Sequence, residues 1–274
     1  MIELLRNSQR RHIRSGKHEV WHSLFAEDLA GPLDSGFGFL LAFDELRIQP
    51  GASTEPHCED EIELVTYVYK GALSQEDTEG NSGVIHTGEF QRMSAGHRIR
   101  HKETSVSRTD GVHLFRMSLR AAQAGLKRGH EQQRFTEAQR RNLFCIVVSP
   151  DGRKGSLRIH QDVLVFSTII DPGHHLVHEL APGRTAWLHA VFGELTINDS
   201  VLTQGDGVGV TNEPSISLTV QESIRRQLPA KGHCRGWLPK KPAVTNPKAE
   251  SRSRLKLGPS RKGCDDAGGR SGAE

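Results

Sequence analysis

The chain has 274 residues, of which 35% are hydrophobic and 5% aromatic, and it contains 36 Lys and Arg against 33 Asp and Glu. The charge is uneven, because residues 223–274 hold 13 of the basic and 4 of the acidic residues, which leaves residues 1–222 with a net charge of −6. A nucleic-acid partner for residues 1–222 therefore has no electrostatic support.

The sequence shows no membrane or secretion signal. No run of about 18 apolar residues could span a bilayer, and residues 1–19 carry basic and histidine side chains without the apolar stretch of a signal peptide. The four cysteines, Cys58, Cys145, Cys234 and Cys264, have no CxxC spacing. That pattern argues against a disulfide framework or a structural zinc site and fits a reducing cytosol. We expect a cytoplasmic monomer with no membrane partner.

The first half of the sequence alternates short strand-like segments with turn residues. The segments rich in β-branched, aromatic and other apolar residues are 40–43, 46–48, 64–69, 84–85 and 112–119. Pro50-Gly51 and the polar loop 77–83 mark turns between them. Short strands at intervals of roughly 8 to 12 residues predict a β-sandwich or barrel.

The second half repeats this plan after a different kind of segment. Residues 121–141 are rich in Gln, Glu, Arg and Ala, and the apolar residues from Phe135 to Leu143 are spaced for a short amphipathic helix. Residues 187–197 then predict two strands separated by Gly193, and residues 65–73 show the same pattern around Gly71. Such a repeat indicates a duplicated barrel.

These segments predict an all-β protein. Residues 1–122 and 146–222 form two tandem β-barrels, residues 123–145 form a short helical connector, and residues 223–274 form a disordered basic tail. The tail begins where a last apolar strand of the second barrel is expected. Either a shifted reading frame near Ser223 leaves a sheet edge unpaired, or the tail is a genuine basic appendage.

Two histidine–glutamate pairs are the strongest candidates for chemistry. His57 and Glu59 are two residues apart, as are His101 and Glu103, and residues i and i+2 of a strand project from the same face. Two such pairs on neighbouring strands can converge on one point. Two imidazoles and two carboxylates suit Fe(II), Mn(II), Ni(II) or Zn(II). Cys58, between the first pair, is expected to point to the opposite face.

Motifs across residues 1–222 resemble the pirin and pirin-like quercetin dioxygenase family. They are Gly36–Leu40, Pro50–Ala52, Ile62–Val68 with Gly71–Leu73, Gly83–Ile85, Gln91–Gly96 leading to His101-x-Glu103, Ser149–Arg153 and Ile159–Asp162. The resemblance implies that both barrels are cupin jelly rolls. It also implies a metal held by a His-x-His pair and a His-x-Glu pair, which fall on His57, Glu59, His101 and Glu103.

Glu59 departs from that pattern, because the family usually has histidine there. As a ligand it would harden the site and favour metals that accept oxygen. Alternatively, Glu59 is a solvated acid in the run of residues 59–61, and the site is lost or held by three residues. Arg98 stands where the family usually has glycine, and Lys102 where it has serine.

The resemblance implies an enzyme with one divalent metal ion, with iron expected first and Mn, Ni or Zn as alternatives. A small aromatic substrate, a flavonol such as quercetin, would be cleaved with O₂, and Glu103 or Glu59 could act as the base. One alternative is a non-enzymatic pirin in which the metal shapes a surface for a protein partner. Another is a degenerate member without the metal.

Other candidate residues are expected to be structural. The histidines between Gly173 and Glu179 are more consistent with a strand or loop than with a zinc helix, because Pro172 and Pro182 leave room for a short strand only. We expect the second barrel to be free of metal, with His160 and His189 packed or hydrogen-bonded. Glu63 and Tyr67 either line the pocket or pack. The same alternatives stay open for three residues of the strand 112–119, namely His113, Arg116 and Met117.

Overall fold

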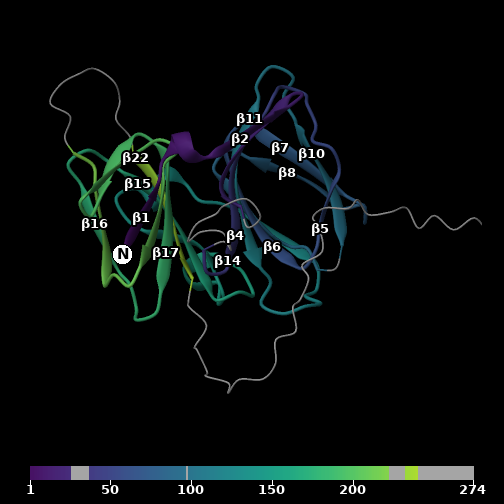
Figure 1. The fold of residues 1–274 in the computed structure, drawn as a ribbon. Helices are drawn as coiled ribbons and strands as arrows, with labels where there is room; N and C mark the ends of the chain where they lie inside the picture. Colours follow the sequence, from purple (N-terminus) through teal and green to yellow (C-terminus); the bar gives the residue numbers. More distant parts are fainter. Residues whose placement is uncertain (26–36, 97, 222–231, 240–274) are drawn as a thin grey trace, which may run out of the picture.

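A computed structural model describes residues 1–25, 37–96, 98–221 and the backbone of 232–239. These residues form two β-barrels that lie side by side (Figure 1). Each barrel consists of a seven-stranded and a four-stranded sheet. The all-β fold of two tandem barrels predicted from the sequence is confirmed.

The first barrel contains most strands of the N-terminal half. Its larger sheet has the order β12 (Gly129–Arg134), β9 (Glu89–Ser94), β6 (Ile62–Lys70), β11 (Val112–Arg120), β4 (Leu40–Ile48), β3 (His18–Phe25) and β2 (Arg11–Ser15). Its smaller sheet has the order β5 (His57–Glu59), β10 (Ile99–Ser105), β7 (Ala72–Asp77) and β8 (Ser82–His86).

The second barrel has the same layout. Its larger sheet has the order β1 (Ile2–Leu5), β20 (Gly207–Thr211), β17 (Thr185–Phe192), β22 (Gly232–Pro239), β15 (Val163–Ile170), β13 (Cys145–Ser149) and β14 (Leu157–Arg158). Its smaller sheet has the order β16 (His175–Glu179), β21 (Ser215–Thr219), β18 (Glu194–Ile197) and β19 (Ser200–Thr203). Single helical turns are η1 (Asn7–Gln9), α1 (Glu137–Arg140) and η2 (Arg153–Gly155).

The N-terminal strand belongs to the second barrel rather than the first. β1 pairs antiparallel with β20 from Ile2↔Val210 to Leu5↔Gly207, and the chain then crosses to β2 of the first barrel (Figure 1). The predicted boundary at residue 1 therefore fails for residues 2–5. An isolated four-residue strand carries too little pattern to show which sheet it joins.

The predicted helical connector contains an edge strand, β12, as well as a short helix. β12 pairs along its length with β9, and only the single turn α1 is helical. Thr136 caps that turn by accepting a hydrogen bond from the backbone of Gln139. Phe135 is buried against Phe90 in the core between the barrels. The Gln- and Arg-rich composition of this segment suits an exposed edge strand as well as a helix.

The predicted disordered tail is wrong for residues 232–239. They form β22, which pairs antiparallel with both β15 and β17, so the sheet edge expected to be unpaired is paired here. Ladder hydrogen bonds depend on the backbone alone, and the Gly- and Arg-containing sequence of this strand gave no alternating signal. The rest of the tail prediction lies outside the described residues.

Three clusters of buried apolar side chains form the cores of the two barrels and of the interface between them. One fills the first barrel and includes Leu46, Val68 and Leu114, and another fills the second barrel. The largest lies between them and joins Phe115 of β11 to Trp187 of β17. β11 is therefore buried on both faces, as its nearly continuous apolar sequence predicts. Within the described residues, no helix has the length and apolarity needed to cross a membrane.

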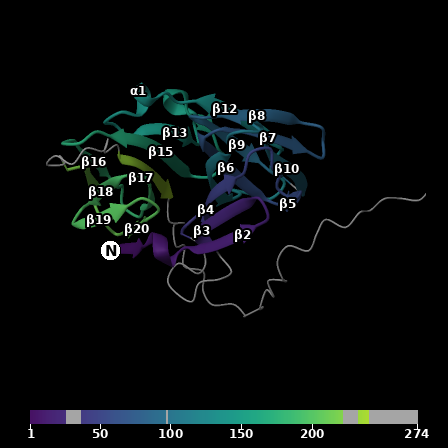
Figure 2. The same cartoon turned by 90° about the horizontal axis from the view of Figure 1, so that it is seen from above.

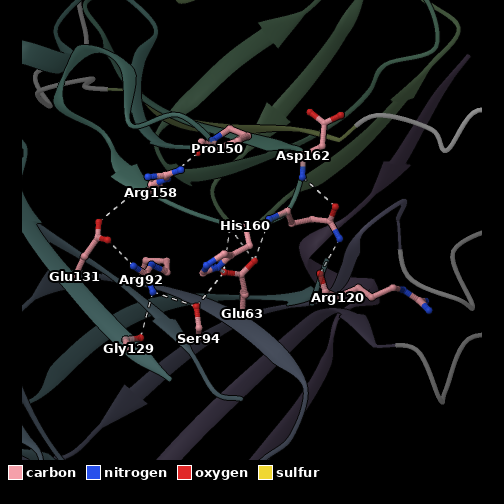
Figure 3. A network of polar contacts seen from close by, with 11 residues as sticks. Glu63, Arg92, Ser94, Arg120, Gly129, Glu131, Pro150, Arg158, His160 and Asp162 are labelled. Atoms are coloured by element: carbon pink, nitrogen blue, oxygen red, sulfur yellow. Dashed lines mark hydrogen bonds and ion pairs between the residues drawn. The ribbon is translucent and has the colours of Figure 1, made fainter. Parts of the chain in front are cut away.

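A buried carboxylate also joins the barrels. Glu63 of β6 accepts hydrogen bonds from the backbone N–H groups of His160 and Gln161, from Nδ1 of His160 at 2.8 Å, and from Ser94 at 3.0 Å (Figure 3). The structure thus places Glu63 at the interface, and His160 is hydrogen-bonded, as expected. The view from above shows β6 between the two halves (Figure 2).

Candidate metal centre

The strand register brings the two predicted pairs together. β5 and β10 are antiparallel neighbours in which His57 stands opposite His101 and Glu59 opposite Ile99. His57, Glu59, His101 and Glu103 are therefore on one face of the small sheet. The short strand β5 lies at the edge of the small sheet and pairs with β10. The chain then turns into β6 at Glu61, which has a φ of 53°.

Three of the four predicted ligands converge within a small volume. The donor atoms of His57, Glu59 and His101 all lie within 4.8 Å of one another. Nε2 of His57 lies 2.6 Å from Nε2 of His101, and 3.8 Å from a carboxylate oxygen of Glu59. The imidazole rings meet edge to face at a centroid distance of 4.2 Å.

Glu103 is held apart from that group by neighbours of its own. Its side chain is fully buried, and Oε1 accepts hydrogen bonds from Gln75 at 2.8 Å and from Arg116. Gln75 stands directly opposite Glu103 on β7, whereas Arg116 reaches it from β11 of the large sheet. Oε2 has no hydrogen-bond partner among the described residues.

The protonation states suit metal binding. Burial lowers the pKa of His101 to about 4. Burial alone would raise the pKa of Glu103, but Arg116, His101 and His57 outweigh it and hold the pKa at about 2. Metal ligands must be neutral imidazole and ionised carboxylate, and at neutral pH His101 and Glu103 are in those forms.

Two further observations test whether these residues fit a metal ion. Nδ1 of His57 contacts the carbonyl oxygen of Glu55 at 3.2 Å, and because a carbonyl only accepts, Nδ1 must carry the proton. Nε2 is then left with its lone pair, as in metal-binding histidines that donate to a backbone carbonyl. The buried Oε2 of Glu103 is a second donor atom in need of a cation. The mixed N and O set fits a divalent metal ion.

The turn before β10 is formed without the family's glycine. Arg98 adopts a φ of 46°, in the left-handed region, which usually costs a non-glycine residue about 1 kcal/mol or more. Its backbone N–H donates to Asp60 at 3.0 Å, which stabilises the turn. Cys58 stands opposite Arg100 in the register and is not in the donor group, as predicted.

The other candidates lie elsewhere. β16 carries His175 and His178 as a strand, which confirms the strand expectation for this segment; His175 contacts Ser217, and His178 packs against Phe144 and Phe166. His189 packs against Phe43 and Phe115 between the barrels. These histidines belong to the second barrel.

Sequence reasoning left the role of Arg116 open and did not single out Gln75. A signal for Arg116 existed, because it shares a face of β11 with Val112 and Leu114, which are buried in the first barrel. A cation at such a position needs an acidic partner. His113, on the other face, contacts Glu45 at 2.8 Å, and Met117 lies in the core between the barrels.

A pocket opens beside the donor group. Its cavity volume is about 50 Å³, it is open to solvent, and it reaches His101. Most of the residues that line it are of polar types and come from β7, β8, β9 and β12; they include Gln75, Gln91 and Gln132, and Met93 lies among them.

Comparisons with known proteins agree with the fold of two barrels. The pirin family model matches residues 6–119, and the model of the quercetinase C-terminal cupin domain matches residues 146–226. A protein of Escherichia coli strain K12 named quercetin 2,3-dioxygenase is 33% identical over 218 residues, which cover 80% of this chain and 93% of the relative. The chain belongs to the pirin family.

Solved bacterial pirins share the fold of this pirin. The crystal structure of YhhW from Escherichia coli has a TM-score of 0.79 and 30% identity, and the match covers 87% of this chain and 97% of YhhW. A structure of YhhW in complex with nickel(II) has a TM-score of 0.78 and 29% identity, and covers 88% and 99%. The two barrels of this pirin are therefore cupin domains.

Proposed function

We propose that this pirin is a metal-dependent dioxygenase that acts on a flavonol such as quercetin. The observation that carries the proposal is the convergence of His57, Glu59 and His101 beside a pocket. The relative at 33% identity, named quercetin 2,3-dioxygenase, supports the substrate class.

The metal would be held by His57, Glu59 and His101, with Oε2 of Glu103 as the fourth protein donor. When bound, a divalent ion would supply Lewis-acid stabilisation of a substrate oxygen and a route for reaction with O₂. Iron is our first expectation, because a second carboxylate favours an ion that accepts oxygen ligands. Nickel is the first alternative, since the YhhW complex contains it.

Glu59 is the better candidate for the base. Glu103 is fully buried, is bonded through Oε1 to Arg116 and has a pKa of about 2, so its carboxylate is a weak base. The side chain of Glu59 is 19% exposed, and a hydroxyl of a bound substrate can approach it. In this role Glu59 accepts the proton of the flavonol hydroxyl.

The pocket would position the flavonol. Its amide side chains, Gln75, Gln91 and Gln132, can donate to and accept from the hydroxyl groups of a polyhydroxylated ring, and Met93 offers an apolar contact to the ring face. We further propose that the protein works as a cytoplasmic monomer with this small aromatic substrate as its partner.

Oxygen consumption with quercetin tests the proposal. The chain reconstituted with Fe(II) or Ni(II) is expected to consume O₂, and Glu59→Gln, which keeps the shape and removes the charge, is expected to lose activity by about a hundredfold. His175→Ala, outside the site, serves as the control and should keep full activity. Stoichiometric metal without ring cleavage would favour the non-enzymatic, protein-binding pirin. Absence of metal binding would contradict both functions.

A further inference from the structure

A second pocket lies at one end of the large sheet of the first barrel. Its cavity volume is about 440 Å³, it is open to solvent, and it shares no lining residue with the pocket beside the candidate metal centre. The lysines and arginines that line it are Lys17, Arg47 and Lys70, and the one acidic residue of the lining is Glu19. Residues 1–222 as a whole carry a net charge of −6. The pocket is therefore a positively charged hollow in an acidic part of the chain.

The strand register places two of these cations in one row. Arg47 of β4 stands opposite His113 of β11, and His113 stands opposite Lys70 of β6. Ile48 and Val112, the next residues along β4 and β11, belong to the core of the first barrel, so Arg47 and His113 lie on the other face of the sheet. Because neighbouring strands are about 5 Å apart, the backbones of Arg47 and Lys70 are about 10 Å apart. Their long side chains can therefore reach one group placed over His113.

The turn between β2 and β3 adds the third cation. The backbone N–H of Gln49 donates to the carbonyl oxygen of Lys17 at 2.9 Å, which holds this turn against the end of β4. Lys17 and Lys70 are both exposed, and neither forms an ion pair with a residue that the structure describes. Their ammonium groups are therefore available to an anion in the pocket.

Arg47 is held in place before any ligand binds. Its guanidinium lies over the ring of Trp21, 4.8 Å from the centroid, and its Nη2 donates to Oε1 of Glu45 at 3.0 Å. Its Nε and Nη1 form no hydrogen bond within the described ranges, and the side chain is 49% exposed. A guanidinium fixed in this way loses little conformational freedom on binding, and its remaining N–H groups match the oxygen atoms of a phosphate.

The acidic side chains of this region already have basic partners. Glu19 contacts His12 at 3.3 Å and Arg14 at 3.5 Å. Glu45 is buried behind the pocket and pairs with the buried Arg10 at 2.8 Å. The positive charge of the lining is therefore left for a ligand.

His113 adds a hydrogen-bond acceptor to the pocket. Its Nε2 lies 2.8 Å from Oε1 of Glu45, and because a carboxylate accepts, Nε2 carries the proton. Nδ1 of the neutral ring then has a lone pair that can accept from a hydroxyl group of a ligand. The pocket thus offers cations for an anionic group and an acceptor for a hydroxyl group beside it.

We propose that this pocket binds a phosphoryl group, carried by a small hydroxylated molecule or free as phosphate, through Lys17, Arg47 and Lys70. A phosphoryl group carries up to two negative charges at neutral pH and presents three oxygen atoms, which match three cations arranged around one point. A single carboxylate has one charge and would leave part of this set unpaired. The site is separate from the candidate metal centre, and its test does not depend on the proposed dioxygenase activity.

Calorimetric titration of the full chain with glycerol phosphate, inorganic phosphate and succinate tests the site. Glycerol phosphate is expected to bind at one site per chain, and succinate, a dicarboxylate, is expected to bind at least about tenfold more weakly. Arg47→Gln and Lys70→Gln should each weaken the binding of glycerol phosphate by about tenfold, because each removes a charged donor. Absence of binding of both phosphates, or equal affinity for succinate, would overturn the proposal.

A matched control is available in Lys127, an exposed lysine outside the pocket. Lys127→Gln removes the same charge and should bind glycerol phosphate as the natural chain does. Equal weakening by Lys127→Gln and Lys70→Gln would show attraction by net charge alone and would overturn the site. Lys70 is exposed, so Lys70→Gln should keep the Tm of the natural chain, and a folded Lys70→Gln variant with unchanged affinity would also contradict the proposal.

Two further arms identify the source of the phosphoryl group and the place where it binds. Tighter binding of glycerol phosphate than of inorganic phosphate would assign an organic phosphate to the pocket, and equal or tighter binding of inorganic phosphate would assign free phosphate; either result supports the site. His101→Ala, which changes the candidate metal centre, should bind glycerol phosphate unchanged. Loss of binding in His101→Ala would place the anion at the metal centre and overturn the proposal.

Discussion

At the scale of single residues, two donors of the candidate centre, His57 and Glu103, are each oriented by a second contact. Nδ1 of His57 donates to the carbonyl of Glu55, and Oε1 of Glu103 accepts from Gln75 and Arg116. Contacts of this kind set the tautomer and orientation of ligands and commonly change metal affinity by about ten- to a hundredfold. A metal ion bound here would therefore depend on residues that do not touch it.

Gln75→Ala is expected to weaken Ni(II) binding by about tenfold, because Glu103 loses one of the two donors on Oε1. Competition with a chelator measures the affinity. Gln132→Ala is the matched control, since Gln132 lines the same pocket but bonds Val84 and Glu89 instead of a donor residue. Equal weakening in the two variants would contradict the role given to Gln75.

Glu45→Gln tests a buried ion pair outside the centre. Burial alone would raise the pKa of Glu45, but hydrogen bonds from His113 and Arg10 outweigh it and hold the pKa well below the ordinary value of 4.5. The substitution should lower the free energy of unfolding by about 3 kcal/mol at pH 7. Glu137→Gln, at a carboxylate that is 62% exposed, should cost less than about 0.5 kcal/mol.

The pH dependence of the Glu45 effect follows from the sign of its shift. Because the pKa is lower in the folded state, the stabilisation is complete above the unfolded pKa near 4.5 and is lost as the pH falls through the folded pKa. The difference between Glu45→Gln and the natural chain should therefore shrink below that pH. A difference that stays constant from pH 7 to pH 3 would contradict this assignment.

At this scale the sequence predicted the features that depend only on which residues share one face of a strand. The i, i+2 spacing predicted that His57 and Glu59 share a face with each other, and His101 with Glu103, and the family motif aligned the two pairs. The ion pair of Glu103 with Arg116 depends on how β10 of one sheet faces β11 of the other. A local sequence pattern does not determine the distance between β10 and β11, which belong to different sheets.

At the scale of elements, β22 shows that a strand can form through backbone pairing without an alternating apolar sequence. Its backbone pairs with β15 and β17 over residues 232–239, although this segment lacks an apolar alternation. Barrel strands 40–48 and 62–70 were predictable because their side chains carry the pattern. β12 and β22 were not, because tertiary pairing outweighs weak local propensity.

Truncation tests the role of β22. A chain ending at residue 222 leaves β15 and β17 with unpaired edges, and we expect it to aggregate and to lose at least about 5 °C in Tm. A chain ending at residue 240 keeps the strand and should behave like the full chain. Size-exclusion chromatography and thermal unfolding measure both. A monomeric 1–222 chain with unchanged Tm would contradict the pairing.

At the scale of the whole molecule, the two barrels share one core and one polar network. Phe115 and Trp187 lie in the same apolar cluster, β1 belongs to the opposite barrel from β2, and Glu63 bonds the segment around His160 (Figure 3). An extensive apolar interface makes independent domain motion unfavourable. We therefore expect the barrels to unfold in one cooperative transition.

Glu63→Gln tests this connection. The amide places N–H donors against the N–H groups of His160 and Gln161, so the free energy of unfolding should fall by about 2–3 kcal/mol. Glu131→Gln, at the 44% exposed end of the same network, should cost less than about 1 kcal/mol. Urea unfolding followed by tryptophan fluorescence gives both values, and equal costs would contradict the importance of the buried contact.

Elemental analysis of the reconstituted full chain is the most direct test of the metal centre. After removal of metal and incubation with Fe(II) or Ni(II), we expect about one ion per chain. His101→Ala should lose the ion, whereas His175→Ala in the second barrel should retain it. A natural chain that binds no divalent ion, or a His101→Ala variant that keeps its full metal content, would contradict the centre built from His57, Glu59, His101 and Glu103.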